Sequence, residues 1–386
     1  MNCENTAGTI NTQTPQIIHV HLKKLSLHDF KNYESAQFVF DNKVNCFLGK
    51  NGVGKTNILD AIFYLGFTKS ALIGADAQNV LHGKNQFVIK GEFENQNLGS
   101  DVTVSYAIGS KKIVKIDGNE AKKLSDHIGN YPLVLVAPND VEIIWGGGEL
   151  RRKFFDSLIS QLDKRYLEEL IIYTNQLKQR NSLLRLAAEK GLDQDLLETY
   201  DQKLVSSGNY LHNKRAEFLG SFLPLFKNHY RFISNDHEEE IDILYKSDLA
   251  GENFGLLLKN SIKKDVVIQR TSVGVHRDDF VFTLNGYELK RIGSQGQQKS
   301  FLIGLKLAEF QSIERVKKIK PLLLLDDIFD KLDDERIHKL VTLVVDGTFG
   351  QLFITDARPD RSRGLFQEAS IEAELFLIEN GKLIDA

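Results

Sequence analysis

Residues 49–56 read GKNGVGKT and match the glycine-rich pattern GxxxxGK(S/T). They follow an apolar run at 44–48 and precede an amphipathic stretch that starts at Asn57. A strand that ends in such a loop and opens into a helix points successive backbone N–H groups at one spot, which binds phosphate oxygens. Lys55 would reach the β and γ phosphates of a nucleotide, and the Thr56 hydroxyl would ligate Mg²⁺. The predicted nucleotide contacts of this segment are Gly49, Lys50, Asn51, Gly52, Val53, Gly54, Lys55, Thr56 and Asn57.

A second candidate segment, residues 321–327, reads PLLLLDD. A continuous apolar run is typical of a parallel strand that is buried on both faces, and open α/β sheets bind ligands outside the carboxyl ends of their strands. Asp326 therefore suits the Mg²⁺ ligand that complements Thr56. Asp327 would orient or deprotonate the attacking water in phosphoryl transfer. The predicted catalytic residues are Asp327, Asp326 and Lys55, and the predicted metal ligands are Thr56 and Asp326.

Between these segments, a stretch that starts SQGQ at Ser294 precedes an apolar helix expected at 301–310. Free N–H groups and the positive end of the helix dipole make such a helix start a second anion site. The order of a GKT loop, a long insertion, an S-x-G-Q stretch and an LLLLDD strand resembles the heads of ABC-type ATPases. The resemblance implies that Ser294 contacts the γ-phosphate of ATP held by a partner subunit. It further implies nucleotide contacts from Gly296, Gln297, the D-loop acid Asp333 and the switch residue Thr355.

The spacing of apolar residues changes along the chain. Short strand-like runs alternate with turns up to residue 136, whereas Leu158, Leu162, Tyr166 and Leu170 recur every four residues, which is helical spacing. We therefore expect an α/β fold with an inserted, mainly helical lobe, and by resemblance an ABC-type ATPase head with a P-loop sheet and an antiparallel β subdomain. The predicted parts are a disordered extension at 1–16, the first part of the ATPase domain with the P-loop at 17–148, the helical lobe at 149–270, and the second part with the signature motif and Walker B acids at 271–386.

The composition, with 42% hydrophobic and 26% charged residues among 386, is ordinary for a soluble globular protein. Two cysteines predict no disulfide framework and fit a reducing cytoplasm, where we expect the protein to be. No apolar run reaches the length of a membrane span, so no membrane partner is expected. The formal net charge of −3 does not favour nucleic acid for the whole molecule. Any DNA site must therefore be a local basic patch.

Several short segments are more restrictive than the P-loop. They are FKNY at 30–33, APND at 137–140, RRKFFD at 151–156, LKQRNSLL at 177–184, GVHRDD at 274–279 and SQGQQK at 294–299. Together they resemble the RecF family of bacterial recombinational-repair ATPases along nearly all of residues 19–386. Lys31 stands where the family has an arginine close to the nucleotide, and this replacement loses the bidentate capacity of a guanidinium.

The resemblance to RecF implies an ATP-dependent homodimer on DNA, with ATP and Mg²⁺ as cofactors. Each ATP would lie between the loop at 49–56 of one subunit and Ser294 of the other, and hydrolysis would open the dimer and release DNA. The family recognises single-strand/double-strand junctions at gaps and helps RecR and RecO load the RecA recombinase. Asp327 replaces the glutamate of most ABC ATPases and is one methylene shorter, so we expect slow hydrolysis. The resemblance implies a weak, DNA-stimulated ATPase that is primarily a DNA-binding protein.

A local excess of basic residues supports a DNA site in the helical lobe. Between residues 151 and 232 there are 14 basic and 10 acidic residues, against the negative balance of the whole chain. The alternative is that these are ordinary solvated helix faces, with Arg180 and Arg277 in structural ion pairs. The candidate phosphate contacts are Arg151, Arg152, Lys153, Lys178, Arg180, Lys214 and Arg215.

Other ATPase classes fit the sequence less well. A transporter subunit would carry LSGGQ, a shorter insertion and a membrane partner, and a chromosome-structuring SMC protein would need long heptad repeats, which this chain lacks. A nuclease of the overcoming-lysogenization type would need a cleavage domain after Asp327, for which the chain has no room. An ABC-type ATPase subunit of another DNA-structuring or transport system remains the alternative, as does a scaffold that binds ATP without hydrolysing it.

Overall fold

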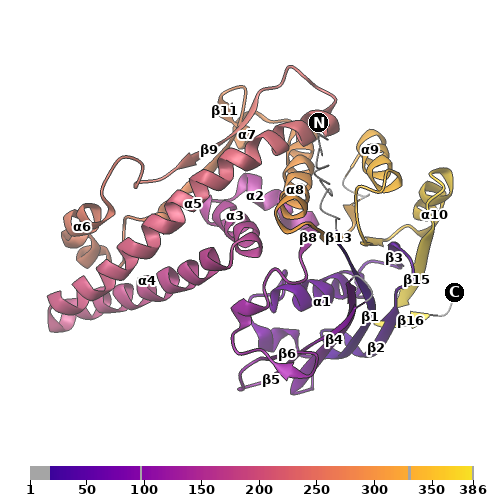
Figure 1. Cartoon of the computed structure of the whole chain (residues 1–386), viewed down its shortest axis with the longest axis horizontal. Helices are drawn as coiled ribbons and strands as arrows, with labels where there is room; N and C mark the ends of the chain where they lie inside the picture. The colour runs from indigo at the N-terminus through magenta and orange to yellow at the C-terminus, as the bar shows by residue number, and fades with distance from the viewer. Residues whose placement is uncertain (1–17, 96–97, 329–331, 385–386) are drawn as a thin grey trace, which may run out of the picture.

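The computed structural model of the chain describes residues 18–95, 98–328 and 332–384 (Figure 1). The extension predicted at 1–16 lies outside the described residues. Within these ranges the chain forms three β-sheets and a set of helices, the two longest of which project from the rest of the molecule as an arm (Figure 1). None of the described helices is both long enough and apolar enough to cross a membrane.

Six strands form the central sheet, in the spatial order β16 (Lys382–Ile384), β15 (Ala373–Glu379), β3 (Val44–Leu48), β14 (Leu352–Asp356), β13 (Leu322–Leu325) and β8 (Leu133–Val136). All neighbours are parallel except β15 and β16. The strands β3, β13 and β14 are buried along their whole length, as expected when both faces of a parallel sheet are covered. Their carboxyl ends therefore meet at one edge of the sheet.

A second sheet contains β12 (Ile319–Lys320), β1 (Ile18–Phe30), β4 (Gln86–Asn95), β5 (Leu98–Ala107), β6 (Ile113–Ile116) and β7 (Asn119–Glu120), with β2 (Tyr33–Val39) also on β1. Apart from the parallel pair β1 and β12, its neighbours are antiparallel. The turn between β6 and β7 is formed by Asp117 and Gly118, both of which have positive φ. This sheet is the antiparallel subdomain expected from the sequence.

Helix α1 (Lys55–Phe67) lies between the two sheets, in contact with β4 and β5 on one side and with β8 and β14 on the other. Ile58, Ala61, Ile62 and Leu65 form the apolar face of the amphipathic stretch and are buried, and Leu59 and Tyr64 outside that face are buried as well. A helix that is covered all round needs apolar residues on every side. The P-loop that precedes α1 is consequently fixed to a rigid, enclosed element.

The segment predicted as a helical lobe contains α3 (Gly148–Leu162), α4 (Lys164–Lys190), α5 (Gln194–Ser234) and α6 (Phe254–Ile268). It also contains one strand that the sequence analysis did not predict, β9 (Ile241–Lys246). This strand pairs with β10 (Asp279–Leu284), which in turn pairs with β11 (Tyr287–Glu288), in a third, antiparallel sheet. Strand pairing thus joins the lobe to the segment that leads into the signature motif.

The remaining helices connect or cover these sheets. They are α2 (Glu142–Trp145), α7 (Leu289–Ile292), α8 (Gln295–Lys317), α9 (Asp334–Val345) and α10 (Pro359–Glu368), with short 3-10 turns η1 (Asp76–Asn79), η2 (Leu124–Asp126), η3 (Pro138–Val141) and η4 (Val275–Arg277). Helix α8 packs along α5 and contributes to the large core that also contains residues of β13 and β14. The signature motif therefore begins a helix that is anchored in the main core.

Helix α8 carries a buried cluster of charges. The Lys306 Nζ lies 3.5 Å from both Asp140 Oδ2 and Glu309 Oε2. Burial raises the pKa of Glu309 to about 7; the positive charge of Lys306 opposes this rise and the negative charge of Asp140 adds to it. Glu309 is therefore expected to change its charge near neutral pH, inside the core.

We expect the Glu309→Gln variant to become more stable relative to the unmodified protein as the pH rises. The pKa of Glu309 is higher in the folded state, at about 7, than its ordinary value of 4.5. The stability that protonated Glu309 contributes is therefore fully present below pH 4.5 and is lost as the pH rises through about 7. Glutamine stays neutral, and the gain between pH 5 and pH 8 should be of order 1–3 kcal/mol in the free energy of unfolding. Urea unfolding at both pH values measures it. The exposed Glu368→Gln serves as control, and a pH-independent difference for Glu309→Gln would contradict the expectation.

Candidate nucleotide-binding site

The P-loop joins β3 to α1, and its glycines adopt backbone conformations that other residues rarely reach. Gly54 has φ of 113°, and a Cβ atom there would lie 2.4 Å from the Asn32 Nδ2. A Cβ atom at Gly49 would lie 2.3 Å from the carbonyl oxygen of Ile378. These positions therefore require glycine. The Lys55 Nζ donates hydrogen bonds to the carbonyl oxygens of Gly49 (2.8 Å) and Lys50 (3.0 Å), so its charge lies inside the loop.

The turn after β1 supports the P-loop from outside. The Asn32 Nδ2 donates to the carbonyl oxygen of Val53 (3.0 Å), and the Asn57 Nδ2 donates to the Asn32 Oδ1 (2.7 Å). The hydroxyl of buried Tyr33 donates to the carbonyl oxygen of Gly54 (3.1 Å). In the sequence, these residues stand out only as part of the FKNY segment. Their role as supports of the loop depends on the folded structure, which places the turn between β1 and β2 against the P-loop.

Lys31, which we expected near the nucleotide, lies beside α1. Its Nζ is 2.5 Å from the Asp60 Oδ2, and both side chains are buried. Asp60 lies one turn beyond Thr56 and also accepts hydrogen bonds from the Ser70 hydroxyl and the Ala71 N–H, both at 2.7 Å. The charge of Lys31 is thus compensated within the protein, and a direct contact with the nucleotide stays a prediction.

The Walker B acids meet the P-loop at the carboxyl edge of the central sheet. The Asp326 Oδ1 accepts hydrogen bonds from the hydroxyls of Thr56 (2.8 Å) and Thr355 (2.7 Å). The backbone N–H of Asp327 donates to the Thr355 hydroxyl at 2.9 Å. Thr355, at the end of β14, therefore connects both acids. Residues that are 270 positions apart in sequence come together here because β3, β14 and β13 are adjacent in the sheet.

The residues at this edge are suitable for Mg²⁺. Burial raises the pKa of Asp326, while the hydroxyls of Thr355 and Thr56 and the charge of Lys55 oppose the rise. A carboxylate and a hydroxyl are hard oxygen donors, which Mg²⁺ prefers, and a bound cation would compensate the buried negative charge. Mg²⁺ at Thr56 and Asp326 would supply charge neutralisation of the phosphoryl oxygens.

The signature motif forms the start of α8. The Ser294 hydroxyl accepts a hydrogen bond from the backbone N–H of Gln297 (3.2 Å), and the Gln297 Oε1 accepts one from the backbone N–H of Ser294 (2.7 Å). This is a capping box, which satisfies free N–H groups of a helix start. Ser294 is exposed. Within the described ranges, no hydrogen bond connects Ser294 to the P-loop, and no residue of the signature motif lines the recess at Thr56 and Asp326. The two sets of predicted nucleotide contacts are therefore separate within one chain.

The D-loop acid is linked to the signature helix. Asp333 caps α9, and its carboxylate pairs with the guanidinium of Arg336. Arg336 also donates to the Ser300 hydroxyl (2.9 Å) and to the carbonyl oxygen of Gly296 (3.2 Å). Arg336 was not predicted from the sequence, because nothing in the local pattern shows that its side chain reaches the start of α8. Arg336 therefore links the Asp333 carboxylate to the start of the signature helix.

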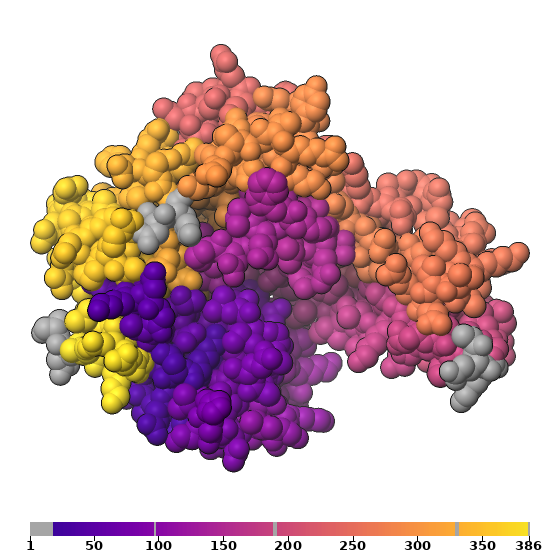
Figure 2. Space-filling model, turned by 180° about the vertical axis from the view of Figure 1, so that it is seen from behind, coloured from indigo at the N-terminus to yellow at the C-terminus, as the bar shows by residue number. Residues whose placement is uncertain are grey.

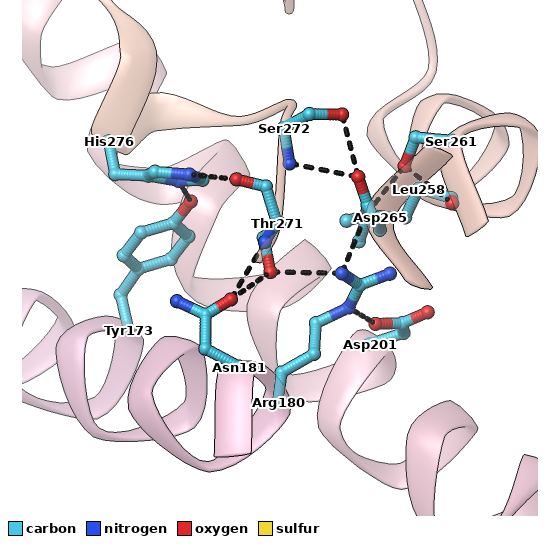
Figure 3. A network of polar contacts seen from close by, with 10 residues as sticks. All are labelled: Tyr173, Arg180, Asn181, Asp201, Leu258, Ser261, Asp265, Thr271, Ser272 and His276. Atoms are coloured by element: carbon cyan, nitrogen blue, oxygen red, sulfur yellow. Dashed lines mark hydrogen bonds and ion pairs between the residues drawn. The ribbon is translucent and has the colours of Figure 1, made fainter. Parts of the chain in front are cut away.

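Three of the candidate DNA contacts lie inside the protein. Arg180 of α4 is fully buried and pairs with Asp201 (2.6 Å) and Asp265 (2.7 Å), and its Nη1 also donates to the Thr271 hydroxyl at 2.9 Å (Figure 3). This network joins α4, α5 and α6 to the segment before His276 (Figure 3). The alternative interpretation of Arg180 as a structural ion pair accounts for its position.

Arg215 and Arg151 are similarly enclosed. Arg215 of α5 pairs with Asp156 and Asp278, both at 2.9 Å, and Arg151 pairs with Asp279 at 2.8 Å. The two arginines are 2% and 5% exposed, so their guanidinium groups have no room for a DNA phosphate. The acids of the GVHRDD segment thus hold the arginines of the helical lobe, and we read Arg215, Arg151 and Arg180 as structural residues.

The other candidates reach the surface to different degrees. Arg152 is half-buried and donates to the carbonyl oxygen of Asp278. Lys153 is exposed and pairs with Glu149 on its own helix at 2.9 Å. Exposed ion pairs of this kind are weak and exchange easily for a phosphate. Lys178 is also exposed, and Lys214 is half-buried beside Glu217. Arg277, for which a structural ion pair was the alternative, is exposed.

A parallel sheet with a P-loop after one strand, paired acids after the next strand but one, and an S-x-G-Q helix define an ABC-type ATPase head. Residues 21–371 match the model of the RecF/RecN/SMC N terminal domain. The DNA replication and repair protein RecF of Flavobacterium johnsoniae is 44% identical over 92% of this chain and 99% of its own length. The corresponding protein of Cytophaga hutchinsonii is 43% identical over 94% of this chain and 96% of its own length.

A solved structure shows the same arrangement. The recombination mediator protein RecF with ATP, from the RecFOR pathway, has a TM-score of 0.86 and 30% identity over 95% of this chain and 98% of its own. The chain belongs to the RecF family of DNA replication and repair proteins. The fold predicted from the sequence, an ABC-type head with an inserted helical lobe, is confirmed by these comparisons.

Proposed function

We propose that the protein is an ATP-dependent homodimeric clamp on DNA, which acts in the bacterial cytoplasm at gaps and single-strand/double-strand junctions. It would promote the loading of RecA together with RecO and RecR, and slow ATP hydrolysis would control its release. Membership of the RecF family supports the role in DNA repair. The solved RecF relative is described as an ATP complex and as a mediator in the RecFOR pathway, which supports ATP as ligand and RecO and RecR as partners.

The observation that carries the proposal is the division of the nucleotide contacts into two surfaces. Thr56, Asp326 and Thr355 meet at the sheet edge, whereas exposed Ser294 is hydrogen-bonded to Gln297 within its own helix. A site that needs both surfaces is completed by a second subunit. Two subunits related by a two-fold axis would complete two such sites at once.

The residues at the sheet edge have distinct roles in this proposal. Backbone N–H groups of the P-loop and the Lys55 ammonium bind and orient the phosphates. Asp327 holds the attacking water and accepts its proton. The Thr355 hydroxyl is hydrogen-bonded to the Asp326 carboxylate and to the backbone N–H of Asp327. Thr355 thereby holds the two acids in a fixed position relative to each other. The short side chain of Asp327 holds water less closely than a glutamate would, which gives slow turnover.

DNA would bind through side chains that reach the surface rather than through the buried arginines. Lys153 and Lys178 are exposed members of the predicted set, and Arg277 is exposed beside the same lobe. Their contacts with phosphates would be independent of sequence and would weaken with salt. Recognition of a gap by strand geometry is consistent with such contacts, because a clamp needs no base-specific readout.

Sedimentation with and without ATP, Mg²⁺ and gapped DNA tests the proposal. We expect the unmodified protein to shift from monomer to dimer with ATP and to bind gapped DNA more tightly in that form. Lys55→Met should lose ATP binding and the shift, and Ser294→Arg should bind ATP but stay monomeric. Gln269→Arg, at an exposed residue directly after α6 in the helical lobe, controls for the added charge. A Ser294→Arg variant that dimerises normally would refute the shared site.

A further inference from the structure

Exposed apolar side chains gather next to the start of the signature helix. Trp145 at the end of α2 is 57% exposed, and Ile292 at the end of α7 is 49% exposed. Helix α2 contacts α7, and Ile144 lines one recess together with Glu288 and Lys290 at the start of α7. We define the tryptophan patch as Val141 and Trp145, one helical turn apart, and Ile292 of the adjacent α7, all of them exposed.

The tryptophan patch is continuous with the surface of the signature motif. Ile292 lies two residues before Ser294, and both are exposed. The backbone N–H of Gly293 donates to the carbonyl oxygen of Leu289 at 2.8 Å and fixes this short connection. In Figure 2 the purple-magenta part of the chain, which contains α2, borders the orange part, which contains α7 and α8. A partner that reaches Ser294 therefore also reaches the patch.

We propose that the tryptophan patch packs against a second copy of this chain in the ATP-bound dimer. The inference rests on the proposed function, which places Ser294 at the dimer interface, and it adds Trp145 as a residue that stabilises this interface. Exposed groups of large apolar residues mark interaction sites. Tryptophan is enriched in the centres of protein interfaces, where a few such residues carry most of the binding energy.

The surface beside the P-loop of a second copy offers an apolar side chain for contact with the tryptophan patch. Leu72, after α1, is 41% exposed and lines a recess together with Thr56 and Asp326. In the proposed dimer, Ser294 of one subunit would face the Thr56 and Asp326 edge of the other, so Ile292, two residues before Ser294, would face the surface that carries Leu72. The contact then occurs twice, once at each nucleotide site. Burial of Trp145 is thereby coupled to closure around ATP.

Intrinsic fluorescence tests the inference directly, because the chain has a single tryptophan. ATP and Mg²⁺ should shift the emission of Trp145 to shorter wavelengths in the unmodified protein as the side chain leaves water. The Ser294→Arg variant binds ATP without dimerising in the proposed function, so its emission should stay unchanged. This comparison separates dimer contact from an effect of ATP on the monomer.

The Trp145→Ala variant should weaken the ATP-dependent dimer by at least about tenfold, as measured by sedimentation over a range of protein concentrations. It should bind ATP as the unmodified protein does, because Trp145 lies outside the predicted nucleotide contacts. Leu256→Ala, at a residue of α6 that is 60% exposed, is the matched control and should dimerise normally. Thermal unfolding of both variants verifies that each is folded.

The outcomes separate this inference from the proposed function. If ATP drives dimerisation while the emission stays constant and Trp145→Ala dimerises normally, the inference is wrong and the clamp proposal stands. If ATP drives no dimerisation at all, both are wrong. An emission shift produced by gapped DNA without ATP would assign Trp145 to a DNA contact and would likewise overturn the inference.

Discussion

The Asp327→Asn variant is expected to hydrolyse ATP about 10²–10⁴-fold more slowly than the unmodified protein. Asparagine cannot accept a proton from the attacking water, whereas the backbone N–H at this position can still donate to the Thr355 hydroxyl, as it does at 2.9 Å. ATP binding and dimerisation should persist, since the P-loop and Ser294 are unchanged. The dimer should therefore remain closed on gapped DNA for much longer, which a steady-state ATPase assay and DNA dissociation kinetics measure together.

Two further variants sharpen this result. Asp327→Glu restores the longer side chain of most ABC ATPases and should raise the hydrolysis rate, because the carboxylate then lies closer to the water. Asp334→Asn, an exposed acid in the first turn of α9, is the matched control and should leave the rate unchanged. An unchanged rate in Asp327→Asn would assign the role of general base to another residue.

The Arg215→Met variant is expected to lose about 3–5 kcal/mol of the free energy of unfolding. Arg215 is 2% exposed, and its guanidinium pairs with Asp156 and Asp278 at 2.9 Å. Methionine fills a similar volume but leaves two carboxylates without their cation in a place where water cannot compensate them. Burial already raises the pKa of Asp278, which the charge of Arg215 opposes, so the loss should be larger at pH 8 than at pH 5.

Chemical denaturation of matched variants measures this loss. Arg231→Met removes an exposed arginine from the same helix and should change stability by less than about 0.5 kcal/mol. Combining Arg215→Met with Asp156→Asn and Asp278→Asn removes the uncompensated charges and should recover part of the loss. Equal stability of Arg215→Met and Arg231→Met would show that the buried cluster does not hold the lobe to the head.

Local sequence was sufficient for the elements that carry the nucleotide site. The apolar run at 44–48, the glycine pattern and the helix from Lys55 follow one another directly, so strand, loop and helix could be placed from adjacent residues alone. The LLLLDD segment was equally clear, because a continuous apolar run predicts a buried parallel strand. The strand β9, by contrast, is short and half-exposed, and its pairing partner lies more than thirty residues away. The alternating Ile241, Ile243 and Tyr245 are the local signal of a strand, but a run this short was not distinguished from the surrounding helices.

The burial of the candidate DNA contacts could not be predicted from local sequence. Arg180 and Lys178 stand two positions apart in the same segment, yet one is buried between two carboxylates and the other is exposed. Basic composition could not distinguish them, because the sign of a charge does not show which helix face is covered. Only the packing of α4 against α5 and α6 decides which of the two basic side chains is compensated inside the protein.

The sequence by itself thus determined which residues could bind phosphate and Mg²⁺, because those chemical roles depend on residue type and on spacing within one loop or strand end. The tertiary structure decided how they are assembled: Thr355 bridges Asp326 and Asp327, Asn32 and Tyr33 support the loop, and Ser294 lies on a separate surface. Such contacts join segments tens to hundreds of residues apart. Their geometry depends on strand order and helix packing, which the core of the whole chain fixes cooperatively.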